Sequence, residues 1–105
     1  TTEIYTLSLH DALPICHAHV LTNLIDYGMD AQESMDSPRV FHVEGRLDVE
    51  RGLGEDVMAG LTALGHEVGR PEMPWGGGQI IAVDWDNGTL AGGSDPRKDG
   101  LALGY

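Results

Sequence analysis

Residues 79–92 read QIIAVDWDNGTLAG, and this stretch decides the fold. Two apolar runs stand on either side of Asn87-Gly88. Asn-Gly tolerates the positive φ angles of a tight hairpin turn, and between apolar runs it is a strong local signal for one. The sequence therefore predicts that strands Gln79–Trp85 and Thr89–Gly92 pair antiparallel across the turn Asp86-Asn87-Gly88.

Two amphipathic helices are expected to cover one side of this hairpin. Residues His17–Asp26 and Glu55–Leu64 carry apolar side chains at helical spacing. Gly28 and Gly65 follow them, and glycine favours the left-handed conformation that ends many helices. The predicted apolar faces consist of Val20, Leu21, Leu24 and Ile25 in the first helix, and of Val57, Met58, Leu61 and Leu64 in the second.

The remaining segments predict short elements. Asp30 can cap a brief helix, Ala31–Met35, which Pro38 ends. Val40–Val43 and Leu47–Glu50 suit strands, because they are rich in residues that favour extended backbone, and Gly45 suits the turn between them. The resulting order of helices and strands predicts an α+β fold, with two amphipathic helices on a small, mostly antiparallel sheet.

Composition excludes several classes of protein. The chain has 105 residues and a formal net charge of −11, so it offers no basic surface for nucleic acid. No apolar run approaches the roughly 18 residues of a membrane span. The one cysteine, Cys16, excludes an internal disulfide framework and a cysteine-based zinc site.

Residues 1–15, TTEIYTLSLHDALPI, match the in-frame translation of a common sequencing adapter over their full length. We therefore expect residues 1–16 to be an adapter-derived artefact, with Cys16 at the junction, and residues 17–105 to be the natural segment. Without Glu3 and Asp11 the charge changes from −11 to −9. The artefact should pack irregularly, with Leu7, Leu9 and Leu13 exposed. The alternative is a genuine strand over Glu3–Leu9.

The residues that could take part in catalysis or in metal or phosphate binding do not form a recognisable motif in the sequence. His17 and His19 lie two apart on a predicted helix, where their side chains diverge, which disfavours a metal site. Gly76–Gly78 precedes a strand and lacks the residues of a phosphate-binding loop. The other candidates lack the spacing of a metal or catalytic motif: His42 and His66, the acidic Asp84, Asp86, Asp95 and Asp99, and Ser34, Ser37 and Ser94.

Seven blocks are spread over nearly all of residues 17–105: NLIDYGMD (23–30), DSPRVF (36–41), VERG (49–52), LGHEV (64–68), GGGQII (76–81), GGSDPRKDG (92–100) and the final Gly104-Tyr105. In order and spacing these blocks resemble the gamma-glutamyltransferase (gamma-glutamyltranspeptidase) family. The block nearest the C-terminus is the most specific. The glycine-rich blocks look closer to the bacterial branch that includes acylase-like members.

The resemblance implies part of an N-terminal-nucleophile hydrolase with an αββα sandwich. Such enzymes cleave their own precursor and use the freed threonine to transfer or hydrolyse a gamma-glutamyl or related amide through an acyl-enzyme. The family's catalytic threonine and its substrate-binding residues lie upstream of His17 in that pattern. We therefore assign no catalytic, substrate-binding, cofactor or metal residue to this chain. Thr22 lies inside a predicted helix, and Thr1 belongs to the adapter segment.

Two hypotheses follow. The first is a C-terminal piece of the small subunit, inactive alone, whose partner is the upstream part of its own precursor and whose intact form acts on a small-molecule amide. The second is a freestanding acidic α+β binding module. Arg39 and Arg97 are expected to bind carboxylates or carbonyls and to tie this segment to the rest of the sandwich. Gly76–Gln79 either packs structurally or approaches the active-site wall.

Overall fold

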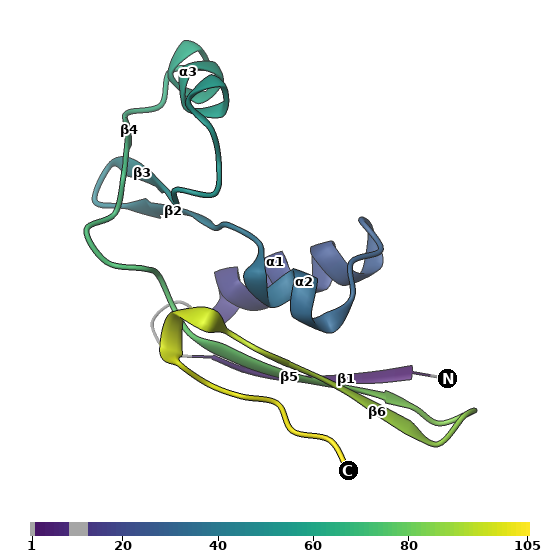
Figure 1. Ribbon diagram of the computed structural model, residues 1–105. Coiled ribbons are helices and arrows are strands. Elements are labelled where there is room, and N and C mark those ends of the chain that lie inside the picture. Colours follow the sequence, from purple (N-terminus) through teal and green to yellow (C-terminus); the bar gives the residue numbers. More distant parts are fainter. Residues whose placement is uncertain (1, 9–12) are drawn as a thin grey trace. The chain divides into compact units, whose positions relative to one another are not determined.

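The computed structural model describes residues 2–8 and 13–105, and for residues 2–8 and 13–15 it describes the backbone. The chain divides into two compact units, each with its own three-stranded sheet. The first unit comprises Thr1–Asp36 and Gly76–Tyr105, and the second comprises Ser37–Trp75. Helices and largely antiparallel strands confirm the predicted α+β class (Figure 1).

The sheet of the first unit contains the predicted hairpin. Strands β5 (Gly78–Asp84) and β6 (Thr89–Ser94) pair antiparallel, from Gln79 opposite Ser94 to Asp84 opposite Thr89. The third strand, β1 (Thr2–Ser8), pairs antiparallel with β5, which is therefore the central strand.

The hairpin turn is one residue longer than expected, because Trp85 lies in the turn. The Asp84 carboxylate accepts hydrogen bonds from the backbone N–H groups of Asp86 and Asn87, at 3.0 and 3.2 Å, and from the Asn87 side chain at 2.7 Å. Gly88 adopts φ +65°, a left-handed value that glycine accepts without strain. Asp84 thus organises the turn that the sequence places here.

Helices α1 (Leu13–Ile25) and α2 (Ala31–Asp36) pack in the same unit. Their core consists of Val20, Ala31, Met35 and Ile80, with Leu24 packed against it. Helix α2 begins with reciprocal bonds: Glu33 N–H donates to Asp30 Oδ1 at 2.8 Å, and Asp30 N–H donates to Glu33 Oε2 at 2.9 Å. This capping box confirms the predicted role of Asp30.

The expectation of irregular packing for residues 1–15 is wrong for residues 2–8, which form a regular edge strand. The backbone alone can make such a pairing, since a sheet edge presents N–H and C=O groups to any extended segment. Leu9 lies outside the described residues, and the side chains of Leu7 and Leu13 are not among those described. Helix α1 also begins four residues before the predicted His17.

The second unit holds the antiparallel pair β2 (Val40–Val43) and β3 (Arg46–Val49). Glu44 and Gly45 form the turn with positive φ angles of 49° and 82°. Strand β4 (Val68–Gly69), which the sequence analysis missed, pairs parallel with β3. Helix α3 (Glu55–Ala63) contacts β4 and has no buried residue. Helix α3, which was expected to cover the β5–β6 hairpin, thus belongs to the other compact unit.

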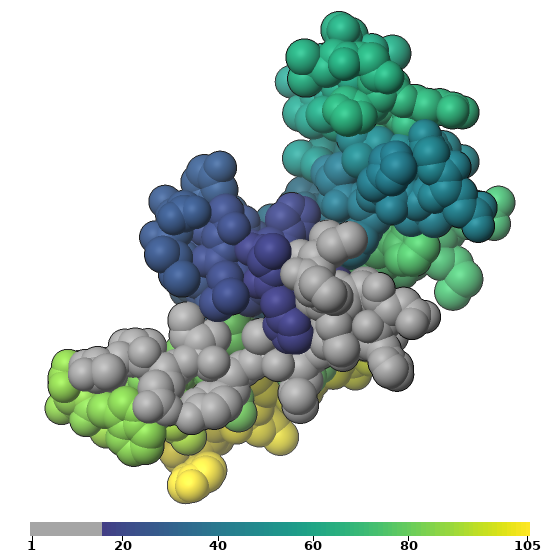
Figure 2. Space-filling model, turned by 180° about the vertical axis from the view of Figure 1, so that it is seen from behind, coloured from purple at the N-terminus to yellow at the C-terminus, as the bar shows by residue number. Residues whose placement is uncertain are grey.

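The C-terminal residues run beside the hairpin of their own unit, where Figure 2 shows the yellow tail next to the green strands. They help to line a groove of 770 Å³ together with Ile81 and Leu90. Gly92 allows this approach, because a Cβ there would lie 3.0 Å from the Ala102 Cβ. None of the described helices has the length and apolar character of a membrane span.

Candidate functional site

The first polar cluster surrounds Asp95, whose side chain is fully buried at the end of β6. Asp95 Oδ2 accepts from Gly78 N–H at 3.1 Å, and Oδ1 accepts from the backbone N–H and Nη1 of Arg97, both at 3.0 Å. Asp95 N–H donates in turn to the Gly78 carbonyl at 3.0 Å. This carboxylate therefore joins the first residue of β5 to the turn after β6.

Two side chains connect that turn and β6 to helix α2. Arg97 Nη1 donates to the Met35 carbonyl at 2.9 Å, which satisfies an acceptor at the C-terminal end of the helix. The Gln32 amide donates to the Ser94 carbonyl at 2.9 Å and accepts from Ser94 N–H at 3.0 Å. Both side chains fix backbone groups, Arg97 at the end of α2 and Gln32 on β6.

The second polar cluster lies in the other unit, around Arg39 and Glu50, which are 3% and 8% exposed. Arg39 Nη1 donates to the Trp75 carbonyl at 2.9 Å. The Glu50 carboxylate accepts from the backbone N–H groups of Arg39 at 2.8 Å and Trp75 at 3.3 Å. The rings of Phe41 and Trp75 lie 5.5 Å apart. Together these contacts hold the segment at Trp75 against the β2–β3 pair.

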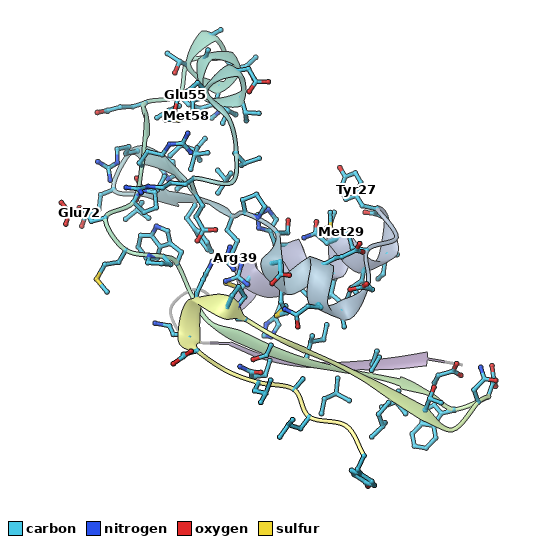
Figure 3. The ribbon with its side chains drawn as sticks, viewed as in Figure 1. Tyr27, Met29, Arg39, Glu55, Met58 and Glu72 are labelled. Atoms are coloured by element: carbon cyan, nitrogen blue, oxygen red, sulfur yellow. The ribbon has the colours of Figure 1, made fainter. Side chains whose placement is uncertain are left out.

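Two further arginines strengthen the second unit. Arg70 donates to the Val49 and Glu50 carbonyls at 3.2 and 2.7 Å, and to Glu55 Oε1 at 2.9 Å. Glu55 lies at the start of α3, on the same helix as Met58 (Figure 3). Arg46 Nε pairs with Asp48 Oδ1 at 2.6 Å, and this hydrogen bond is the main reason that the pKa of Arg46 rises.

The sequence candidates for metal binding occupy separate elements. His17 and His19 lie on α1, His42 lies on β2, and His66 follows α3. Within residues 2–8 and 13–105, no three potential metal ligands come together. Among the acidic candidates, Asp84 binds the hairpin turn, Asp95 binds backbone and Arg97, and Asp99 adopts a left-handed φ of 54° after the 3₁₀ helix η2 (Pro96–Lys98).

The serine, threonine and glycine candidates lie in separate places in helices α1 and α2 and before β5. Ser34 is buried and donates to the Val20 carbonyl at 3.4 Å, and Thr22 lies exposed in the last turn of α1. Gly76 has φ +75°, and a Cβ on Gly77 would overlap the Lys98 side chain. Gly76 thus supplies a left-handed backbone position before β5, and Gly77 lets the Lys98 side chain lie against the backbone there.

The sequence analysis identified Arg39 and Arg97 as ligands of carbonyls or carboxylates, and both bind such groups. The roles of the buried Glu50 and of the exposed Gln32 are not evident from the sequence alone. The sequence does hold a signal for Asp95, since Asp-Pro-Arg is typical of a capped turn: Asp95 accepts from Arg97 N–H two residues on. No pattern in the neighbouring sequence indicates the role of Gln32, because its partner Ser94 is 62 residues away.

The sequence of the chain is similar to a known protein family and to several of its curated members. The family model of gamma-glutamyltranspeptidase matches residues 12–105. The chain is 39% identical over 101 residues to the acylase ACY 1 proenzyme of Pseudomonas sp. (strain V22), covering 94% of this chain and 18% of that protein. It is 39% identical over 89 residues to the glutathione hydrolase proenzyme of Escherichia coli (strain K12), covering 82% of this chain and 15% of that protein.

The fold agrees with solved structures. The cephalosporin acylase of Bacillus halodurans superposes with a TM-score of 0.78 at 35% identity, over 88% of this chain and 18% of that chain. The chain thus spans less than a fifth of the length of these relatives. The match extends through both units and both polar clusters. The chain belongs to the gamma-glutamyltranspeptidase family.

Proposed function

We propose that this chain is the distal part of the small subunit of a gamma-glutamyltranspeptidase-family enzyme. In the intact protein, an N-terminal threonine outside this chain would transfer or hydrolyse a gamma-glutamyl or related amide through an acyl-enzyme. The observation that carries the proposal is the continuous family match over residues 12–105, in a chain that covers only 15–18% of relatives named as proenzymes of a hydrolase and an acylase.

The role proposed for this chain is structural. Its buried charges are directed at backbone groups: Asp95 and Arg97 bind the start of β5 and the end of α2, and Arg39 and Glu50 bind the backbone at Trp75. Groups engaged in this way support a scaffold and are not positioned as a nucleophile and base. We assign catalytic and substrate-binding roles to the upstream part of the same precursor, which would be the partner of this chain.

We also propose that residues 1–16 derive from an adapter and that residues 17–105 are the natural segment. The full-length match of residues 1–15 to a translated adapter carries this proposal, and the family model, which matches residues 12–105, leaves residues 1–11 outside. The approach of Gly76–Gln79 to the active-site wall of the intact enzyme remains the alternative to a purely structural role for that segment.

The test is release of p-nitroaniline from a gamma-glutamyl anilide by the purified chain and by the same chain without Thr1. Both should show no turnover above buffer and no self-cleavage. Loss of one oxyanion donor alone typically lowers rates by about a hundred- to a thousandfold, and here we propose that the whole set is elsewhere. Turnover that disappears with Thr1 would contradict the proposal. Specific binding of a partner by the folded chain, with native gene sequence upstream of residue 17, would instead favour the binding-module alternative.

A further inference from the structure

The turn between β5 and β6 contains the one Asn-Gly pair of the sequence, Asn87-Gly88. The turn lies at the tip of the hairpin (Figure 1), and its four residues, 85–88, are all exposed. At such a pair the backbone nitrogen of the glycine can attack the side-chain amide carbon of the asparagine, because the glycine has no Cβ to hinder the approach. Loss of ammonia from Asn87 is the reaction that this pair favours.

The backbone nitrogen of Gly88 meets the requirements of the attacking group. Among the described residues, none accepts a hydrogen bond from the Gly88 N–H. A Cβ on Gly88 would meet no atom within 4 Å, so solvent reaches this part of the backbone. Solvent hydroxide can therefore remove the proton of this nitrogen without first breaking a hydrogen bond of the protein.

The Asp84 carboxylate holds the amide that would leave. Asn87 Nδ2 donates to Asp84 Oδ2 at 2.7 Å, while Asp84 Oδ1 accepts from the backbone N–H groups of Asp86 and Asn87. Ring closure brings Asn87 Cγ against the Gly88 nitrogen and makes that carbon tetrahedral, so the amide leaves the position in which Asp84 holds it. A hydrogen bond that is lost on the way to the transition state raises the barrier and slows the reaction.

We propose that Asn87 is a site of spontaneous deamidation and that Asp84 slows the reaction by holding the side-chain amide. The Gly88 nitrogen gives its proton to hydroxide and forms a bond to Asn87 Cγ. The Cγ–Nδ2 bond then breaks, and Nδ2 leaves as ammonia after taking a proton from water. Water opens the five-membered imide at either carbonyl, which leaves aspartate or isoaspartate at position 87. The proposal is independent of the catalytic proposal and of the adapter origin of residues 1–16.

The product changes the turn, because a hydrogen-bond donor becomes an acceptor. A carboxylate at position 87 has no N–H to donate to Asp84 Oδ2, and it places a second negative charge beside Asp84. In the separated deamidated chain, hydrogen exchange at the turn end of β5–β6 should be about three- to tenfold faster than in the parent, the effect of losing about one net hydrogen bond. Unchanged exchange would overturn the role given to Asp84.

The first experiment incubates the full chain at mildly alkaline pH, in buffer and in urea, and locates the product by peptide mapping with mass spectrometry. Asn23 is the internal control, because it lies in α1 and is followed by Leu24, whose N–H belongs to the helix. Asn87 should react about three- to tenfold more slowly in buffer than in urea, and Asn23 in buffer should stay intact. No reaction of Asn87 in buffer, or equal reaction of Asn23 there, would overturn the site. Equal rates for Asn87 in the two solvents would overturn the role of Asp84.

Two matched variants isolate the hydrogen bond. Asp84→Ser keeps one oxygen for the backbone donors of the turn but loses the second, which holds Asn87. It should speed deamidation in buffer by about three- to tenfold, whereas Asp86→Ser, which removes a charge from the same turn, should change the rate by less than about threefold. Equal acceleration by the two variants, or acceleration by Asp84→Ser that persists in urea, would overturn the role of Asp84. If hydrogen exchange shows that Asp84→Ser opens the hairpin, the parent rates in buffer and urea decide.

Discussion

At the scale of single residues, the buried charges have the clearest consequences. Asp95 is fully buried and binds Gly78 N–H and the backbone and side chain of Arg97, whose side chain is 10% exposed. Removing one partner of a buried pair leaves the other charge uncompensated and typically costs about 3–5 kcal/mol. This carboxylate therefore contributes more to the fold than the chain's many surface acids.

Asp95→Ala should lower the free energy of unfolding by about 3–5 kcal/mol, measured by urea denaturation at neutral pH. The matched control is Glu72→Ala, an exposed acid in a loop of the other unit (Figure 3), which should stay within about 0.5 kcal/mol of the parent chain. A loss below about 1 kcal/mol for Asp95→Ala would show that the pair adds little.

The stability of the hairpin turn should depend on pH through the carboxyl group of Asp84. The hydrogen bond from the Asn87 side chain, followed by that from its backbone N–H, lowers the pKa of Asp84. A lowered folded-state pKa means that the stabilisation is present above the unfolded-state pKa and is lost as pH falls through the folded-state pKa. Asn87→Ala should raise the pKa of Asp84 but leave it below the ordinary value, since backbone donors remain. A carboxyl NMR titration measures this, and an unchanged pKa would contradict the assignment.

At the scale of elements, the close approach of β6 to α2 depends on Gly93. A Cβ there would lie 2.6 Å from the Ala31 carbonyl oxygen and 2.8 Å from Ile80 Cγ2. Gly93→Ala should therefore destabilise the fold by about 1–3 kcal/mol through overpacking. Gly60→Ala is the matched control, because a Cβ in α3 meets nothing within 4 Å, and it should stabilise by about 0.5–1 kcal/mol. Thermal unfolding that ranks the two variants in the opposite order would contradict this packing.

Local chemistry explains which elements were predictable. Asn87-Gly88 and the Asp30–Glu33 capping box act within a few residues, so the β5–β6 hairpin and α2 follow from the sequence. The apolar face of α3 does not indicate which sheet the helix contacts. Strand β4 has only two residues, and it depends on a partner strand some twenty residues away in the sequence. Likewise, the sequence predicts that Arg39 and Arg97 bind carbonyls or carboxylates. It does not predict which carbonyls they bind, because those of Trp75 and Met35 are far along the chain.

At the scale of the whole molecule, apolar side chains remain exposed beside the groove at the β5–β6 hairpin. Leu90, Leu101 and Leu103 are 70–83% exposed. A contiguous apolar surface favours association, so the purified chain should self-associate as its concentration rises, measured by sedimentation velocity. Leu90→Lys/Leu103→Lys should weaken this association, and a chain that stays monomeric at high concentration would contradict the prediction.

The central claim is that residues 17–105 are a structural part of a gamma-glutamyltranspeptidase-family enzyme whose catalytic groups lie elsewhere. The most direct test replaces the matching segment of the E. coli glutathione hydrolase proenzyme with these residues and measures hydrolysis of glutathione. The account predicts that the chimera processes itself and hydrolyses glutathione, while the isolated chain does neither. A folded chimera without processing or hydrolysis, or turnover by the isolated chain, would contradict it.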